Sequence, residues 1–459
     1  MQDQFTETVR LKISNALKME FPSGTRREQI LPSVPRRANV ITGMRRAGKT
    51  FYLFQCLHDA LAQGVARERL VYFSLDDLRL GKLGSLDGSH LLRIVEAYYQ
   101  KFPNFRGTEE VVFCFDEIQL VQEWERAVRL LMDSEKARVF FSGSSAKMLS
   151  REVATSMRGR SIETTITPFS FREFAAARGR VLDGSADARA RSWLQKTLDD
   201  YLRIGGFPEL TNVAEARVWD ILLQDHVNGV LSRDIIDRHN IRSTGLLDAF
   251  ARQLLCNPAK EFSVSKIAGD FASRGIGVSK DTLLAFLDYF KDAFLVFPVG
   301  IFSGSERQRQ VNPRKLYLAD HSLARAFTPS PFLERGRLLE NIVACEMARE
   351  MREFSYMKTT TGKEVDFIAT ASDGSRHLIQ VAADVSAPKT WEREVRALIE
   401  ARKEVKDATP WLLCETMPPP NFEKPEKINI MPLYQWLSTG IAGFQRAGWS
   451  TNWPPQLVH

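Results

Sequence analysis

The stretch from Val40 to Thr50, VITGMRRAGKT, decides the fold of this chain. Uncharged residues lead into a glycine, and two arginines and a lysine follow within a few positions. From Gly43 onward the stretch matches the pattern G-x-x-x-x-G-K-[ST] at every fixed position. Glycines let backbone N–H groups turn toward phosphate oxygens, and the N-terminus of a following helix adds its dipole. This density of positive charge therefore predicts a bound nucleoside triphosphate.

The surroundings of the motif fit a strand, a loop and a helix. Residues 37–42 predict a short strand, and residues 50–55 open a helical pattern. Lys49 is predicted to contact the β- and γ-phosphates, and Thr50 is predicted to hold Mg²⁺. We therefore expect ATP and Mg²⁺ as ligands. The predicted nucleotide-binding residues are Gly43, Met44, Arg45, Arg46, Ala47, Gly48, Lys49, Thr50 and Phe51.

A second segment, residues 111–117 (VVFCFDE), has five residues without charge followed by two carboxylates. The uncharged run predicts a strand that is buried on both faces. Asp116 is predicted to be a Mg²⁺ ligand and a residue of the nucleotide site. Glu117 is predicted to be the base that polarises the attacking water. A strand that merely ends in solvated acids is the alternative for this segment alone.

A third run, residues 138–141, predicts a neighbouring strand, and Ser-Gly-Ser-Ser follows it. A small hydroxyl at the end of that strand is suited to hydrogen-bond the γ-phosphate or the attacking water. Ser144 is predicted to make this hydrogen bond, and Ser142 is the alternative. An ordinary turn is the alternative explanation of this run.

At this point the sequence resembles the AAA+-related ATPases of bacteria and archaea that carry a C-terminal domain of unknown function with a nuclease-like fold. The stretches PFSFREF (residues 168–174) and GGFPE (residues 205–209) are the most specific carriers of the resemblance, which spans about residues 36–413. The resemblance implies a five-stranded parallel sheet flanked by helices and followed by a helical lid. The other carriers are the three motifs above, the triplet 158–160 (RGR) and residues 364–367 (EVDF).

Such ATPases usually place the nucleotide between neighbouring subunits, where an arginine stabilises charge on the transferred phosphoryl group. Arg160 is the preferred candidate for this catalytic role, and Arg158 and Arg233 are the alternatives. A solvated or ion-paired surface arginine is the other explanation for each of them. The resemblance implies a homo-oligomer, which we expect to be a hexameric ring.

The bulk composition is that of a soluble protein. Of 459 residues, 44% are hydrophobic and 26% are charged, and the net charge is +7, so a polyanionic partner is one possibility. Five scattered cysteines without a Cys-x-x-Cys pair indicate reduced thiols and no zinc site. No apolar run is long enough to cross a membrane, and the N-terminus lacks the features of a signal peptide. We therefore expect a cytoplasmic protein without a membrane partner.

The middle of the chain predicts a winged helix. Ser263 or Ser265 can cap a helix to about residue 271, Ser279 can cap a second helix to residue 291, and strands are expected at residues 294–297 and 315–318. A polar loop is expected between these strands. The predicted contacts with DNA phosphates come from Arg307, Arg309, Arg314 and Lys315. A winged helix that serves only domain packing is the alternative.

The C-terminal third has the order helix, three strands, helix, strand, which resembles the restriction-endonuclease-like fold. Active members hold Mg²⁺ with an aspartate and an E-x-K tripeptide. Asp366 lies where the aspartate is expected, and Glu340 lies where a helix acid often is. The tripeptide here begins with Gln380 and ends with Ala382, which supplies no ammonium. We therefore expect a nuclease fold without nuclease activity.

Together these patterns predict an α/β chain: a P-loop AAA+-like parallel sheet with a helical lid, then a winged helix, then a degenerate restriction-endonuclease-like domain. The expected function is a Mg²⁺-dependent ATPase motor acting on DNA, with branch migration of Holliday junctions as its concrete form. A nucleotide-dependent regulatory or defence switch that binds protein partners, or an ATP-powered nuclease, is the alternative. The expected domains are an N-terminal extension (1–35), the ATPase core (36–168), the lid (169–240), the winged helix (241–325) and the nuclease-like domain (326–459).

Overall fold

The computed structural model describes residues 2–32, 34–81, 85–144, 157, 159–180, 188–328, 333–351, 353–423 and 425–440. The chain divides into two compact units, which we describe separately. Unit 1 comprises residues 1–168 and 292–294, and unit 2 comprises residues 169–291 and 295–459. No helix in the described ranges is long and apolar enough to span a bilayer.

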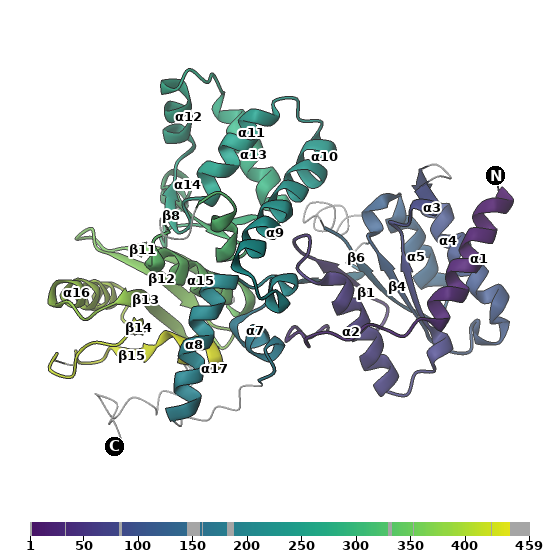
Figure 1. The fold of residues 1–459 in the computed structure, drawn as a ribbon, viewed down its shortest axis with the longest axis horizontal. Coiled ribbons are helices and arrows are strands. Elements are labelled where there is room, and N and C mark those ends of the chain that lie inside the picture. Colours follow the sequence, from purple (N-terminus) through teal and green to yellow (C-terminus); the bar gives the residue numbers. More distant parts are fainter. Residues whose placement is uncertain are drawn as a thin grey trace. The chain divides into compact units, whose positions relative to one another are not determined.

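Unit 1 is built on a five-stranded sheet with the order β2-β4-β6-β1-β7. Figure 1 labels three of these strands, β1, β4 and β6. Every pairing in this sheet is parallel, as in the expected P-loop ATPase fold. The uncharged run before Asp116 forms the fully buried strand β4, as its composition predicts. The strands are β1 (Ala38–Thr42), β2 (Leu70–Ser74), β4 (Val111–Asp116), β6 (Ala137–Ser142) and β7 (Ser161–Thr165); β3 (Leu86–Asp87) and β5 (Val121–Gln122) form a separate short pair.

Helices α1, α3, α4 and α5 of unit 1 contribute to one continuous apolar cluster against the strands. Phe5, Val9 and Ile13, which repeat at helical spacing along α1, belong to this cluster. The first helix is therefore packed into the core of unit 1. The helices are α1 (Gln2–Lys18), α2 (Lys49–Ala62), α3 (Leu78–Gly81), α4 (Gly88–Lys101) and α5 (Trp124–Ser134).

Unit 2 begins with helices and continues into a three-stranded antiparallel sheet of order β8-β10-β9. Along the chain the order is helix, strand, two helices and two strands, which agrees with the predicted order, and the winged helix stays a prediction. The elements are α7 (Phe171–Ala177), α8 (Ala188–Ile204), α9 (Ala216–Gly229), the π-helix η5 (Val230–Ile236), α10 (Asp237–His239), α11 (Thr244–Leu255), β8 (Lys260–Phe262), α12 (Val264–Ser273), α13 (Lys280–Asp292), β9 (Val296–Val299) and β10 (Arg314–Leu318).

Two local predictions in this region are wrong. The first strand begins at Val296 instead of residue 294, because Phe294 has a φ of 56° in the left-handed region and interrupts the extended backbone. The polar loop after it contains the short helix α14 (Glu306–Val311). Its N-terminus is capped by Ser305, whose hydroxyl accepts a hydrogen bond from the Gln308 amide at 3.4 Å.

The C-terminal part of unit 2 is a five-stranded mixed sheet with the order β11-β12-β13-β14-β15. The first three strands pair antiparallel, and the last two pairings are parallel. The helix and strand order agrees with the sequence, and the restriction-endonuclease-like fold stays a prediction. The elements are α15 (Arg335–Glu350), β11 (Glu353–Lys358), β12 (Glu364–Thr370), β13 (Arg376–Asp384), α16 (Pro388–Glu404), β14 (Ala408–Thr416), β15 (Asn429–Pro432) and α17 (Leu433–Thr439).

Candidate active site

The topology of unit 1 brings the three sequence motifs to one edge of the sheet. Strand β6 lies between β1 and β4, and all three run parallel. Their carboxyl ends therefore lie together, where open parallel sheets bind ligands. The glycine-rich loop follows β1, Asp116 ends β4, and Ser142 ends β6.

The glycines of the loop are required by its backbone. Gly43 has a φ of 137°, and a Cβ atom there would lie 2.0 Å from the carbonyl oxygen of Ile166. Gly48, the residue before α2, has a φ of 99°. Neither conformation is open to a larger residue without strain. A glycine-rich turn that leads directly into the N-terminus of a helix is the arrangement that binds phosphate.

Lys49 is buried in this loop, with an exposed fraction of 5%. Its ammonium donates hydrogen bonds to the carbonyl oxygens of Gly43 and Met44, at 3.0 and 3.1 Å. The lysine thus lies folded back on the loop that a triphosphate would enter. Arg45 is half-buried and Arg46 is exposed, so the loop also presents positive charge to solvent.

Thr50 and Asp116, the two predicted Mg²⁺ ligands, are in contact. The Thr50 hydroxyl donates to Asp116 Oδ2 at 2.7 Å, and the Tyr72 hydroxyl donates to the same oxygen at 2.8 Å. Ser142 donates to the other carboxylate oxygen, Oδ1. Burial and the charge of Asp116 raise the pKa of Tyr72, which keeps it a donor. A carboxylate and a hydroxyl are the hard oxygen ligands that suit Mg²⁺, so the residues fit this ion.

Glu117, the predicted base, is held in an unusual backbone conformation with a φ of 60°. Its amide donates to the hydroxyl of Ser142 at 3.2 Å, which fixes the turn after β4. Its carboxylate accepts a hydrogen bond from Gln119 Nε2. The same Gln119 nitrogen lies 3.5 Å from the hydroxyl of Ser144, which is buried. Ser144 therefore lies near the predicted base, through Gln119.

Three residues of the site have no signal in the motifs: Tyr72, Gln119 and Arg27. Arg27 is buried, and its guanidinium donates to the carbonyl oxygen of Ala47 at 2.8 Å and to that of Thr167 at 2.5 Å. It therefore braces the glycine-rich loop from the N-terminal segment. No motif marks these residues, because Tyr72 and Arg27 reach the site from other segments and Gln119 reaches Glu117 around the turn after β4.

The candidate arginines differ in their exposure and in their partners. Arg160 is half-exposed, and its guanidinium forms an ion pair with Asp133. Arg233 is exposed on the π-helix η5, a distorted helix type often found at functional sites. Arg158 lies outside the described residues. Phe51, in the first turn of α2, is half-exposed.

Unit 2 contains a second cluster of charges, centred on Lys315 of β10. Its ammonium lies 2.9 Å from Glu340, 2.6 Å from Glu364 and 3.5 Å from Asp366. Glu340 Oε1 also accepts a hydrogen bond from the hydroxyl of Tyr317 at 2.7 Å. Within the described ranges, no group of three or more His, Cys, Asp or Glu side chains is arranged to hold a metal ion.

The pKa values in this cluster are shifted by burial and by mutual charge. Burial alone would lower the pKa of Lys315, but the charges of Asp366, Glu340 and Glu364 outweigh it and raise the pKa. Burial and the nearby charge of Glu340 raise the pKa of Asp366 well above its usual value. The ammonium is therefore firmly charged, whereas the cluster has more carboxylates than it can neutralise.

This cluster corrects two expectations. The sequence predicts that Lys315 contacts DNA with its neighbour Arg314, yet Lys315 is only 3% exposed, because alternate residues of β10 face opposite sides and Lys315 faces α15 and β12. The sequence also predicts that no cation lies beside Asp366, because Ala382 supplies none. The ammonium of Lys315 lies there instead, delivered from another strand.

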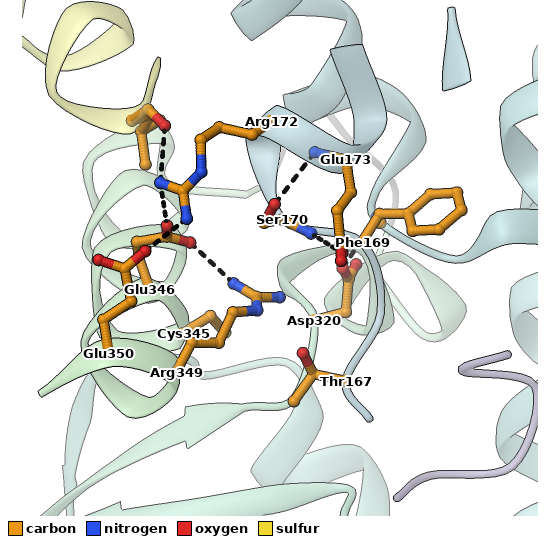
Figure 2. A network of polar contacts seen from close by, with 12 residues as sticks. Thr167, Phe169, Ser170, Arg172, Glu173, Asp320, Cys345, Glu346, Arg349 and Glu350 are labelled. Carbon is orange, nitrogen blue, oxygen red and sulfur yellow. Dashed lines mark hydrogen bonds and ion pairs between the residues drawn. The ribbon is translucent and has the colours of Figure 1, made fainter. Parts of the chain in front are cut away.

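The PFSFREF stretch has a structural role in unit 2 (Figure 2). Ser170 and Glu173 form a reciprocal cap at the start of α7, with both backbone-to-side-chain hydrogen bonds at 3.0 Å. Arg172 forms an ion pair with Glu346 at 2.7 Å and another with Glu350, both on α15. Arg349 pairs with Glu346 at 3.1 Å. This buried network fixes α7 to α15.

The GGFPE stretch is also structural. Gly205 has a φ of 89°, and a Cβ atom there would lie 2.2 Å from the hydroxyl oxygen of Ser322. The amide of Gly206 donates to Asp320 at 2.8 Å, and its carbonyl oxygen accepts from the Phe169 amide at 2.6 Å. The two glycines therefore allow close approach of the segment after β10. Residues of both stretches therefore make contacts that hold elements of unit 2 together.

Comparison with known families agrees with this architecture. Residues 35–175 match the family model described as an AAA domain. Two models described as domains of unknown function match residues 195–332 (DUF8612) and 335–436 (DUF4143). Residues 35–175 are therefore similar to AAA domains, in agreement with the predicted P-loop fold.

Curated relatives extend over most of the chain. An uncharacterised protein of Methanocaldococcus jannaschii, MJ1544, is 31% identical over 416 residues, which are 88% of this chain and 89% of the relative. An uncharacterised protein of Haemophilus influenzae is 28% identical over 75% of this chain and 82% of its own length.

Among solved structures, the Walker-type ATPase PABY2304 of Pyrococcus abyssi is 15% identical and covers 70% of this chain and 95% of its own, with a TM-score of 0.41. The ORC1 protein of Aeropyrum pernix, solved in complex with DNA, is 14% identical over 72% of this chain and 93% of its own, with a TM-score of 0.29.

Proposed function

The chain belongs to the same family as the uncharacterised M. jannaschii protein, and we propose that it is a Mg²⁺-dependent ATP hydrolase. The observation that carries the proposal is the 2.7 Å contact between Thr50 and Asp116 at the mouth of the glycine-rich loop, with Glu117 next in sequence. A hydroxyl, a carboxylate and a second acid at the end of parallel strands are the groups that ATP hydrolysis requires.

Each residue has a distinct task in the proposed reaction. Thr50 and Asp116 would hold Mg²⁺, which neutralises charge on the phosphates when bound. Lys49 would leave the carbonyl oxygens of its own loop and donate to the terminal phosphates instead. Glu117 would accept a proton from the attacking water, and its carboxylate is oriented by Gln119. Ser144, which lies close to Gln119, would donate a hydrogen bond to the γ-phosphate or to the attacking water.

We further propose a homo-oligomer in which an arginine completes the site of the neighbouring subunit. Arg160 is the preferred residue, and it would have to leave its ion pair with Asp133. Arg233 is the alternative, and no hydrogen bond or ion pair engages its side chain among the residues described. A hexameric ring is the expected assembly.

DNA is the proposed macromolecular substrate, with four-way junctions as the specific form. The support comes from the segment between β9 and β10, which we propose to be the wing of a winged helix. Arg307, Arg309 and Arg314 are exposed there. Arg309 and Arg314 line a hollow of about 240 Å³ beside Phe302, which is 39% exposed. Cations beside an exposed aromatic ring suit a nucleic-acid backbone and its bases.

One observation favours the second candidate, a nucleotide-dependent switch that binds protein. Helix α13 would be the reading helix of a winged helix, yet its exposed residues include Asp281, Leu284 and Asp288. Two acids would repel phosphates in a groove of DNA, whereas an exposed leucine suits a protein surface.

ATP turnover measured without DNA and with duplex, single-stranded and four-way DNA separates these candidates. The motor predicts strong stimulation by junction DNA, and indifference to every DNA would favour the switch. Replacing Arg307 and Arg309 with Ala should also lower the log–log salt slope of DNA binding by roughly 0.9 for each phosphate that the variant no longer binds. An unchanged slope would remove this segment from the DNA interface.

A further inference from the structure

We propose that a basic hollow lined by α16 and two loops in the C-terminal part of unit 2 docks an acidic segment of a protein partner. The hollow lies between the end of α16 and the segment before β15, and its volume is about 580 Å³. That volume accommodates one or two side chains of a bound peptide. Its floor is apolar and is formed by Leu398, Ile399, Pro425 and Ile428.

The rim of this hollow carries unneutralised positive charge. Lys403, Lys406 and Lys427 are exposed, and no hydrogen bond or ion pair engages their ammonium groups among the described residues. Arg402 is half-buried beside them and donates to the carbonyl oxygen of Lys427 at 3.1 Å. Against these four cations, Glu426 is the acid that lines the hollow.

The acids nearest in sequence are already engaged elsewhere. Glu400 and Glu404, on the same helix as Lys403, accept hydrogen bonds from the hairpin residues Thr361 and Thr360. Asp407, which follows Lys406, pairs with Arg376 at 3.2 Å. These three carboxylates therefore have partners outside the hollow, and Glu426 faces four cations of its lining.

The chemistry of floor and rim together identifies the occupant. A nucleic-acid backbone would meet the cations but would bring little apolar surface to the floor. Ile399 is 40% exposed, which an apolar side chain would cover. Residues 441–459 of this chain contain no Asp or Glu and do not complement the rim. An extended or helical segment that combines carboxylates with a leucine or phenylalanine satisfies both features.

Fluorescence anisotropy with the full chain tests the proposal. The probe is a fluorescein-labelled peptide with a leucine pair between glutamate pairs, and a matched peptide has glutamine at every glutamate. The acidic peptide should bind, and the affinity should fall as salt rises. Lys403→Glu with Lys406→Glu should weaken binding at least about tenfold, because two attractive contacts become repulsive. Ile399→Asp should weaken it as well.

A matched charge change elsewhere is the control. Lys280→Glu with Lys389→Glu alters two exposed lysines outside the hollow and should leave peptide affinity unchanged. Thermal unfolding of every variant checks that the fold is retained. Absence of binding by the wild type, equal binding of the glutamine peptide, or an equal loss in the control variant would overturn the proposal. Duplex DNA that displaces the peptide would also overturn it, and would assign the hollow to a phosphate backbone.

Discussion

Lys49 of unit 1 and Lys315 of unit 2 are almost equally buried, at 5% and 3% exposed, but their partners differ in charge. The Lys49 ammonium donates to two neutral carbonyl oxygens of its own loop. The Lys315 ammonium lies within 3.5 Å of three carboxylates from other elements. Hydrogen bonds to neutral carbonyl oxygens can be exchanged for hydrogen bonds to phosphate oxygens, whereas contacts with three carboxylates already neutralise the charge of Lys315.

The comparison explains why one region can act on a phosphate while the other holds the fold together. In unit 1, Lys49 lies in a loop whose glycines Gly43 and Gly48 have positive φ values. We expect the oxygens of a triphosphate to replace the two carbonyl oxygens that Lys49 contacts. Unit 2 places its lysine where β10, α15 and β12 meet, so the lysine joins three elements. Removing each lysine should therefore have separate effects, the first on binding and the second on stability.

The largest effect on nucleotide binding is expected for Lys49→Ala. Loss of an ammonium that donates to phosphate oxygens removes charged hydrogen bonds worth on the order of 3 kcal/mol, which is a loss of affinity of about a hundredfold. Binding of a fluorescent ATP analogue measures this change. The melting temperature should stay close to that of the wild type. An affinity for ATP equal to that of the wild type would remove Lys49 from the phosphate site.

Lys315→Met should lower the stability of the fold and leave ATP affinity unchanged. Removal of the ammonium leaves buried carboxylates without their cation, and breaking such a pair costs about 3–5 kcal/mol of unfolding free energy. Chemical denaturation monitors the loss, and ATP affinity below the melting temperature should be retained. Adding Glu340→Gln to this variant should recover part of the stability. Unchanged stability of Lys315→Met would show that the cluster contributes nothing to the fold.

Asp366→Asn should have a smaller effect that depends on pH. The folded-state pKa of Asp366 is raised by burial and by Glu340, so this group favours folding below its unfolded pKa and loses that contribution as pH rises through the folded pKa. The variant should therefore become more stable relative to the wild type as pH rises above the unfolded pKa of an aspartate, and chemical denaturation at a series of pH values measures this change.

Asp384→Asn is the matched control for this pH dependence. Asp384 lies at the end of the neighbouring strand, and its pKa is lowered by hydrogen bonds from Ser386. Its contribution to stability is present above the unfolded pKa and is lost on acidification, so the relative stability of this variant should change with pH in the opposite direction. If the relative stability of both variants changed with pH in the same direction, the assigned directions of the two pKa shifts would be contradicted.

The last prediction is that DNA cleavage is absent. Purified protein with Mg²⁺ or Mn²⁺ should not cut linear, circular or branched DNA, with or without ATP. Cleavage requires a metal held by anionic ligands, and the ammonium of Lys315 already lies among Glu340, Glu364 and Asp366. Asp366→Ala should leave ATP hydrolysis largely intact. Cleavage by the wild type that disappears in Asp366→Ala would make the ATP-powered nuclease the leading function.

The sequence predicts what is encoded within one segment. The glycine-rich loop and the buried strand before Asp116 each follow from a short local pattern, and the parallel sheet of unit 1 agrees with both. Tyr72, Gln119 and Arg27 could not be predicted, because only the folded chain brings their side chains to the site. Each makes a contact across the fold or around a tight turn that no spacing rule specifies.

Lys315 shows how a local pattern can mislead. It follows Arg314 in a run rich in arginine, which suggests one exposed basic surface. The alternation of side chains along a strand sends neighbouring residues to opposite faces, and β10 is exposed at Arg314 and buried at Lys315. The identity of the buried partners depends on α15 and β12, which come later in the chain.

Single-turnover hydrolysis of ATP by Glu117→Gln tests the central claim most directly. The amide keeps the shape of the side chain but cannot accept the proton of the attacking water, and Asp116 remains for Mg²⁺. With enzyme in excess over radiolabelled ATP, the variant should bind ATP as the wild type does and hydrolyse it at least about a hundredfold more slowly. Hydrolysis at the rate of the wild type would contradict the account and show that another residue activates the water.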